Sequence, residues 1–173
     1  IPADSPHYQR LHAAAAKHTD NIVSFGFSSH ADVRVLDHVA ASNGGSLITA
    51  QLPNGALCFT LSQPGKHWIA NSMAVLAAVE AVGGDLAAAG LAMAELGGMV
   101  GRGARHQIAV NGGTALLIDE SYNANPASMR ATISDLGKTG GARLIAVLGS
   151  MKELGSMSDH YHSAIADELY AAN

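Results

Sequence analysis

The densest group of polar side chains that could do chemistry lies between residues 119 and 125. Asp119 and Glu120 directly follow an apolar run, and Asn125 precedes Pro126 at the predicted start of a helix. Carboxylates beyond the carboxyl end of a strand could hold ribose hydroxyls or a metal ion, and a helix N-terminus suits phosphate. The same residues could equally form a solvated loop in which Asn125 only caps the helix. Both interpretations stay open on this segment alone.

The elements before this segment predict a sheet that carries helices. Residues 57–61 alternate between the two faces of a strand, and Asn54-Gly55 is a strong hairpin turn signal. The segment from Trp68 to Val82 is apolar almost all round, which is typical of a buried helix. The other predicted elements are a helix over 5–18 that Ser5 caps, strands over 21–26, 33–39, 47–52 and 56–62, and a helix that Asp85 caps and that ends before Gly97.

The pattern changes after the glycine-rich residues 97–103, which predict a hinge or domain boundary. The apolar run 143–148 is typical of a strand in a parallel sheet that is covered on both faces. The order strand, helix, strand, helix from residue 114 onward is that of a nucleotide-binding α/β unit. The predicted elements are strands over 107–110, 114–118 and 143–148, a helix that Asn125 caps with Met129, Ile133 and Leu136 on one face, and a helix from Ser158.

Composition excludes several classes of protein. The 173 residues are 48% hydrophobic and 14% charged, which suits a folded chain, and the net charge of -4 argues against general nucleic-acid binding. The single cysteine excludes an intrachain disulfide, and no apolar run is long enough to span a bilayer. We expect a cytoplasmic protein. Ile1 in place of methionine suggests processing or an incomplete chain.

Other constellations of reactive side chains are weak. The 9 histidines are scattered, and His160 and His162 point to different faces of a helix, so no metal site is predicted. Cys58 alternates into the exposed face of the hairpin without a base beside it, and Ser121 and Ser128 lack a nucleophile elbow.

Four motifs, in the same order along the chain, resemble those of the Mur ligase family. The similarity covers nearly the whole chain and is weakest over residues 1–60. Trp68 stands where the family often has asparagine, and Ser150 replaces the usual aspartate. The motifs are Gly65-Lys66-His67-Trp68-Ile69-Ala70-Asn71, Val100-Gly101-Arg102, residues 118–129 with Tyr122-Asn123-Ala124-Asn125-Pro126, and residues 147–155 followed by His162.

The resemblance implies an α/β protein in two parts. Residues 1–102 would be the end of a central ATPase domain, a sheet with a hairpin and buried helices. Residues 103–173 would begin a Rossmann-like C-terminal domain. The family's phosphate-binding loop, magnesium ligands and UDP-binding domain would lie before Ile1. Gly137-Lys138-Thr139 does not form that loop, because it ends an amphipathic helix.

The resemblance also implies roles for individual residues. Closure of the two domains over ATP would bring Arg102 and Asp119 to one nucleotide. The implied roles are adenine binding for His67 and Asn71, contacts to the ATP ribose and phosphates for Arg102, ribose contacts for Asp119 or Glu120, and shaping of the site around the nucleotide for Asn125 and around the incoming substrate for Tyr122 and Asn123.

The activity that the resemblance implies is ATP-dependent amide ligation in peptidoglycan synthesis. Its Tyr-Asn-Ala-Asn-Pro form resembles that of the member that adds D-alanyl-D-alanine to a UDP-N-acetylmuramoyl peptide through an acyl phosphate. ATP and Mg²⁺ would be required, and a monomer is favoured. Because the chain lacks the phosphate-binding loop, we expect it to be inactive by itself. The alternatives are a non-catalytic nucleotide-binding homologue, a Mur ligase for a different amino acid, and a dinucleotide-dependent oxidoreductase, which the missing Gly-x-Gly-x-x-Gly after a strand disfavours.

Overall fold

A computed structural model describes residues 1–41, 44–98 and 100–172. The chain divides into two compact units, Ile1–Leu96 and Gly97–Asn173. Part of the predicted hinge, Met99, lies outside the described residues. Within the described residues, no helix is long and apolar enough to cross a membrane. The boundary at residues 102 and 103 stays a prediction.

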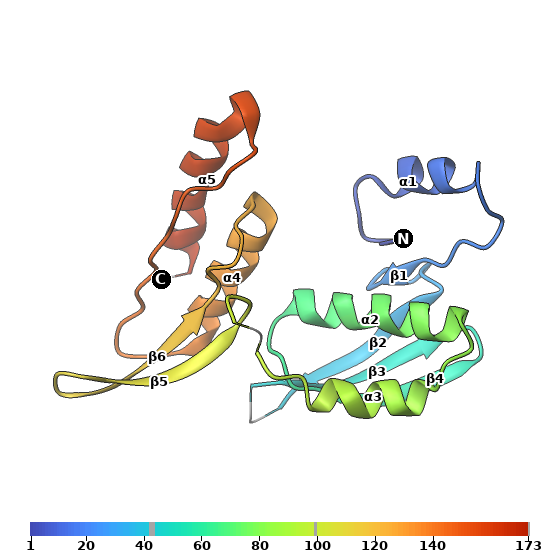
Figure 1. Cartoon of the computed structure of the whole chain (residues 1–173), viewed down its shortest axis with the longest axis horizontal. Helices are drawn as coiled ribbons and strands as arrows, with labels where there is room; N and C mark the ends of the chain where they lie inside the picture. Colours follow the sequence, from blue (N-terminus) through green and yellow to red (C-terminus); the bar gives the residue numbers. More distant parts are fainter. Residues whose placement is uncertain (42–43, 99, 173) are drawn as a thin grey trace. The chain divides into compact units, whose positions relative to one another are not determined.

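The first unit is a four-stranded sheet with helices (Figure 1). Its strand order is β1-β2-β3-β4, in which β1 and β2 are parallel and the other neighbours are antiparallel. The register of β2 on β3 shifts between Val35 and Asp37. The elements are α1 (Tyr8–Ala15), β1 (Phe25–Gly26), β2 (Val33–Ala40), β3 (Ser46–Leu52), β4 (Gly55–Leu61), α2 (Lys66–Ala81) and α3 (Leu86–Ala94).

The hairpin of β3 and β4 confirms its prediction. Leu52 pairs with Gly55, so the connection is the two residues Pro53 and Asn54. Phe59 and Leu61 are buried, whereas Cys58 between them and the turn is exposed, as the alternation predicts.

The N-terminal elements are shorter than predicted. The Ser5 hydroxyl accepts the N–H of His7 in a local turn, so the helix begins only at Tyr8 and has no side-chain cap. The predicted strand over 21–26 shrinks to Phe25–Gly26. Backbone bonds between residues 1–3 and 23–25 continue the pairing before that point.

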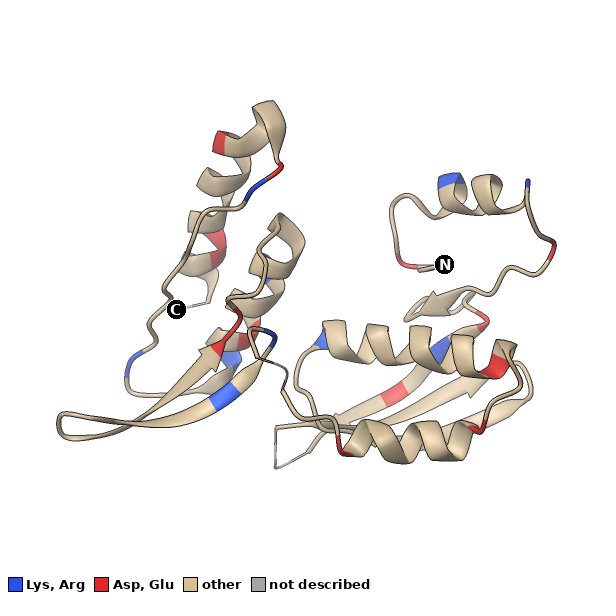
Figure 2. Cartoon of the chain, in the orientation of Figure 1, with Lys and Arg blue, Asp and Glu red and all other residues tan. Residues whose placement is uncertain are grey.

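The helix α2 is buried on one face only, so the prediction of burial almost all round is wrong. Ile69, Met73 and Leu76 are at most 3% exposed, whereas Val75 on the opposite side is 49% exposed. Both α2 and α3 are uncharged along most of their length (Figure 2). Apolarity without a polar stripe therefore could not tell which side faces the sheet.

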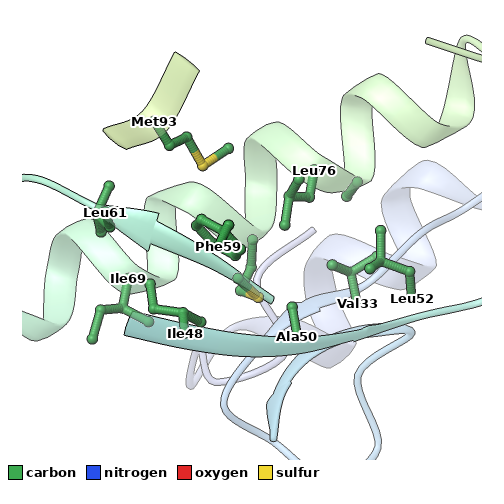
Figure 3. Packing of buried hydrophobic residues seen from close by; sticks show 11 residues of the cluster. Val33, Ile48, Ala50, Leu52, Phe59, Leu61, Ile69, Leu76 and Met93 are labelled. Atoms are coloured by element: carbon green, nitrogen blue, oxygen red, sulfur yellow. The ribbon is translucent and has the colours of Figure 1, made fainter. Parts of the chain in front are cut away.

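One hydrophobic core holds the first unit together (Figure 3). Side chains from β2, β3 and β4 meet side chains from α2 and α3, and Asp85 accepts the N–H of Ala88 to cap α3 as predicted. The buried members are Val33, Ile48, Ala50, Leu52, Phe59, Leu61, Ile69, Met73, Leu76, Ala77 and Met93.

The second unit combines a hairpin with two long helices. Its strands pair from Ala104 with Asp119 to Val110 with Gly113 around Asn111-Gly112, which confirms the predicted turn. The elements are β5 (Ala104–Val110), β6 (Gly113–Asp119), α4 (Pro126–Thr139), the short 3₁₀ helix Gly155–Met157 and α5 (Ser158–Ala171).

The predicted strand over 143–148 is wrong in this structure. These residues have no regular structure, and Val147 is 93% exposed. A strand needs a neighbour for its backbone N–H and C=O groups, and the described part of this unit offers only the β5-β6 hairpin, in which the two strands pair with each other. An apolar run by itself indicates that its residues favour an extended, buried conformation. It does not show that a partner strand is present.

The two helices of the second unit pack closely at one point. A Cβ on Gly137 would lie 2.8 Å from the backbone oxygen of Ala172, so only glycine permits this approach. Lys138 pairs with Asp135 at 3.2 Å, and Thr139 donates to the Asp135 carbonyl oxygen. Gly137-Lys138-Thr139 thus ends α4, as predicted, and does not form a phosphate-binding loop.

Candidate functional site

Two predicted adenine-binding residues lie on the uncovered side of α2. His67 and Asn71 are one helical turn apart, and Asn71 is exposed, whereas the core-facing side chains lie on the opposite face. The helix follows Gly65, whose φ of 105° suits glycine. The exposed Asn71 side chain is therefore placed where a ligand can reach it, and the half-buried His67 lies one turn before it on the same face.

Trp68 lies between this exposed face and the core. Its ring centroid is 5.9 Å from that of His67, and its side chain packs against the hydrophobic core of the first unit. The tryptophan that stands here in place of the family's asparagine therefore packs against the core of the first unit. Trp68 contributes apolar contact beneath His67.

Asp119, at the end of β6, organises the turn that follows it. Oδ1 accepts the N–H of Ser121 at 3.0 Å, and Oδ2 accepts the N–H of Gly101 at 3.1 Å. Hydrogen bonds from the Ser121 hydroxyl and backbone, and then from Gly101, lower the pKa of Asp119. Asp119 is thus held ionised with lone pairs left over for a further donor.

Ser121 is a contributor that the sequence interpretation did not include. Its N–H donates to Asp119 Oδ1 at 3.0 Å, and its hydroxyl is the largest cause of the lowered pKa of Asp119. The available signal was the Asp-x-Ser spacing, because an aspartate often accepts the N–H two residues on.

Arg102 belongs to the same constellation as Asp119. Its neighbour Gly101 binds the Asp119 carboxylate, and its other neighbour Gly103 donates to the Asp119 backbone oxygen at 2.9 Å. The guanidinium of Arg102 lies over the ring of Tyr122, 4.2 Å from its centroid. Arg102 and Asp119 are therefore neighbours within the second unit, and domain closure is not needed to bring them together.

Glu120 differs from its neighbour Asp119 in the direction of its pKa shift. Burial, and then the negative charges of Asp119 and Asp135, raise the pKa of Glu120. Adjacent carboxylates thus have pKa values shifted in opposite directions, and Asp119 is the one better suited to accept hydrogen bonds as an anion.

The amides of the Tyr-Asn-Ala-Asn-Pro motif have local partners. Asn125 Oδ1 accepts the N–H groups of Ala127 and Ser128, and the Ser128 hydroxyl accepts the N–H of Asn125, which makes a capping box at α4. Asn123 Oδ1 accepts the N–H of Ala124 at 2.9 Å. The cap interpretation of Asn125 is confirmed, and its contact with a ligand stays a prediction.

The fourth motif is tied to α5 by His162. His162 Nε2 accepts the N–H of Met151 at 2.9 Å, and Nδ1 lies 2.8 Å from the Ser158 carbonyl oxygen. Because an N–H can only donate, the proton of the neutral ring lies on Nδ1. Met151 is buried beside Ile133 and Ile165, whereas Ser150 is exposed. This motif thus has a structural explanation within the second unit.

Among the described residues, no group of three or more His, Cys, Asp or Glu side chains could hold a metal ion. The carboxylates Asp119 and Glu120 are therefore candidates for hydrogen bonding. That the magnesium ligands implied by the resemblance lie elsewhere in the full protein stays a prediction.

Comparison with known proteins decides the family. A model of the Mur ligase middle domain matches residues 1–79, and a model described as "Mur ligase, glutamate ligase domain" matches residues 101–173. The chain belongs to the Mur ligase family. The second match begins at Gly101, so it includes Arg102 together with the Asp119 turn.

Individual Mur ligases extend this result. The UDP-N-acetylmuramoyl-tripeptide–D-alanyl-D-alanine ligase of Escherichia coli (strain K12) is 36% identical over 135 residues, which are 78% of this chain and 29% of that protein. The crystal structure of MurF from Acinetobacter baumannii superimposes with a TM-score of 0.85 and 28% identity over 98% of this chain and 35% of that chain. MurF from Thermotoga maritima, solved in complex with ADP, shares the fold with a TM-score of 0.73 and 24% identity over 93% of this chain and 36% of that one. The chain thus spans about a third of these Mur ligases.

Proposed function

We propose that this chain is part of an ATP-dependent ligase that adds D-alanyl-D-alanine to a UDP-N-acetylmuramoyl peptide in the cytoplasm. The observation that carries the proposal is the match along 78% of the chain to a ligase with that name. The hydrogen bonds that hold the backbone beside Arg102 to Asp119 support the proposal. They place an arginine, which suits phosphate, near an ionised carboxylate, which suits hydroxyl groups.

The reaction proceeds in two steps. The terminal carboxylate of the UDP-linked peptide attacks the γ-phosphorus of ATP, which forms an acyl phosphate and releases ADP. The amine of D-alanyl-D-alanine then attacks the acyl carbon, so that an amide bond forms, phosphate leaves and the amine loses a proton. Bound Mg²⁺ would neutralise phosphate charge, with ligands supplied by other residues of the full protein.

The described side chains divide the work of binding ATP. His67 and Asn71 contact the adenine from α2, and Arg102 contacts the phosphates with its planar fork. Asp119 accepts from the ribose, and Glu120 contributes to the same contact. Asn123 and Asn125 shape the surroundings of the nucleotide and the dipeptide, and Tyr122 lies against Arg102 on the nucleotide side. The full protein acts as a monomer, and the 173 residues alone are inactive because their sequence contains no phosphate-binding loop.

The test uses the full natural protein that contains these residues. It is incubated with ATP, Mg²⁺, a UDP-N-acetylmuramoyl tripeptide and D-alanyl-D-alanine, and the product is identified by mass spectrometry while phosphate is measured. We expect one phosphate for each amide bond formed, and neither without the dipeptide.

Two results would contradict the proposal. Ligation of L-alanine to UDP-N-acetylmuramate in place of the dipeptide would indicate a Mur ligase for a different amino acid. Nucleotide binding without any ligation would indicate a non-catalytic homologue.

A further inference from the structure

The backbone on both sides of Arg102 is fixed. Gly101 has a φ of 71°, and a Cβ there would lie 2.9 Å from the backbone nitrogen of Tyr122, so this position requires glycine. The N–H of Tyr122 donates to the Gly101 carbonyl oxygen at 3.1 Å, and Gly103 is bonded to Asp119. The side chain of Arg102 therefore extends from a backbone that is fixed on both sides by hydrogen bonds within the second unit.

The side chain of Arg102 makes one contact of note. Its guanidinium carbon lies 4.2 Å from the centroid of the Tyr122 ring, which is stacking distance for a cation over an aromatic face. Among the described residues, Arg102 forms no ion pair, so its N–H donors stay available in the guanidinium plane. The guanidinium has five N–H donors, and a contact with one aromatic ring leaves donors that can bind a ligand.

Burial does not explain the aromatic ring at this position. Tyr122 is 68% exposed, so its side chain contributes little to the core of the second unit. Its backbone N–H, by contrast, would bond Gly101 whatever the side chain. The feature that depends on the ring is the contact with Arg102.

We propose that Tyr122 is a positioning residue that holds the Arg102 guanidinium ready for the phosphates of a nucleoside triphosphate. A long flexible side chain loses conformational freedom when it binds, and a stacked arginine has already lost part of it. This inference rests on the proposed function in that it assigns phosphate to Arg102. It gives Tyr122 a role that acts through Arg102, without direct contact to the dipeptide.

A double-mutant cycle in the full natural protein tests the inference. The affinity for β,γ-imido-ATP is measured by calorimetric titration for Tyr122→Leu, Tyr122→Phe, Arg102→Ala and Tyr122→Leu/Arg102→Ala. Tyr122→Leu should weaken binding about two- to five-fold, the range of an exposed cation–π contact. Tyr122→Phe, which keeps the ring, should restore most of that loss. In the Arg102→Ala background, Tyr122→Leu should change the affinity less than about 1.5-fold, because its partner is absent.

Controls separate positioning from folding and from direct substrate contact. Tyr170→Leu, at a tyrosine of α5 that is 82% exposed, should leave the affinity unchanged. Melting temperatures identify any variant that is unfolded, and the KM for D-alanyl-D-alanine should not change in Tyr122→Leu.

The following outcomes would overturn the inference or the proposed function. Equal losses in the wild-type and Arg102→Ala backgrounds, a Tyr122→Phe variant as weak as Tyr122→Leu, or a raised KM for the dipeptide alone would overturn the inference. If the wild-type protein binds the analogue but does not ligate, the proposed function fails while the cycle still tests Tyr122. If it binds no nucleotide, both fail.

Discussion

The two units differ in how well each buries its own apolar side chains. The core cluster of the first unit has 11 buried residues drawn from three strands and two helices. That of the second has three, Ile133, Met151 and Ile165, one each from α4, the loop before α5 and α5. Yet the second unit contains the hydrogen-bonded segments of Arg102 and Asp119. The difference teaches that polar motifs can be fixed by local hydrogen bonds where little core is available.

The apolar residues that the second unit leaves exposed show the same contrast. Ile145 and Val147 are 63% and 93% exposed in a segment whose composition suits a buried strand. In the first unit, β3 has strands on both sides and helices over one face. Apolar sequence is therefore converted into core only where neighbouring elements supply the second surface.

The largest expected effect concerns the two cores. Leu76→Ala should lower the free energy of unfolding by about 3–5 kcal/mol, because Leu76 is fully buried among well-packed neighbours. Ile133→Ala should cost less, about 2 kcal/mol, because its smaller cluster can collapse around the cavity. Denaturant unfolding followed by circular dichroism measures both. Val75→Ala, on the exposed face of α2, is the control and should cost under about 1 kcal/mol. A larger loss from Ile133→Ala than from Leu76→Ala would reverse the comparison.

A smaller change in the free energy of unfolding is expected from substitutions at Asp32 and Ser24, which form a polar network in the first unit. Asp32 Oδ2 accepts both the N–H and the hydroxyl of Ser24, which is 3% exposed, at 2.8 and 2.6 Å. Asp32→Ala should cost about 2–4 kcal/mol, since two buried donors lose their acceptor. Ser24→Ala should cost only about 1 kcal/mol, because the exposed carboxylate can be solvated by water. Equal losses in chemical denaturation would show that the buried donors find another partner.

The smallest expected effect is the pH dependence that Glu120 brings to the second unit. Its pKa is raised above 4.5, so the folded state holds the proton more tightly, and stability falls as the pH rises through that range. Glu120→Gln should therefore raise the melting temperature at pH 7 by roughly 1 °C, since the half-exposed group is screened by solvent. The gain should vanish below about pH 4, where glutamate is protonated.

The matched control is Glu95→Gln, an exposed glutamate after α3. It should show no such difference between the two pH values. A melting temperature of Glu120→Gln that stays below that of the unchanged protein at pH 7 would show that the charge of Glu120 stabilises the fold.

Local signals in the sequence predicted most elements correctly. The hairpin turns at residues 53–55 and 111–112, the Asp85 and Asn125 caps and the helix end at Thr139 depend on neighbouring residues alone, and the structure confirms them. Elements that need distant partners were predicted less well. The strand over 143–148 lacks a neighbour, and α2 shows no polar stripe that could reveal its exposed side.

The candidate site was predicted in part for the same reason. The motif order identified Arg102 and Asp119, but not the backbone bonds from Gly101 and Gly103 that make them neighbours, because these join residues far apart in sequence. The stacking of Arg102 on Tyr122 likewise depends on the three-dimensional turn. The roles of the two residues stay predictions until they are measured.

The most direct test of the proposed nucleotide contacts is the affinity of the full natural protein for β,γ-imido-ATP after Asn71→Ala and after Asp119→Ala. We predict weaker binding in both, about five-fold for the neutral amide and about ten-fold for the charged acceptor, while Asn21→Ala and Asp159→Ala bind as tightly as the unchanged protein. Unchanged affinity in either Asn71→Ala or Asp119→Ala would contradict the proposed role of that residue in nucleotide binding.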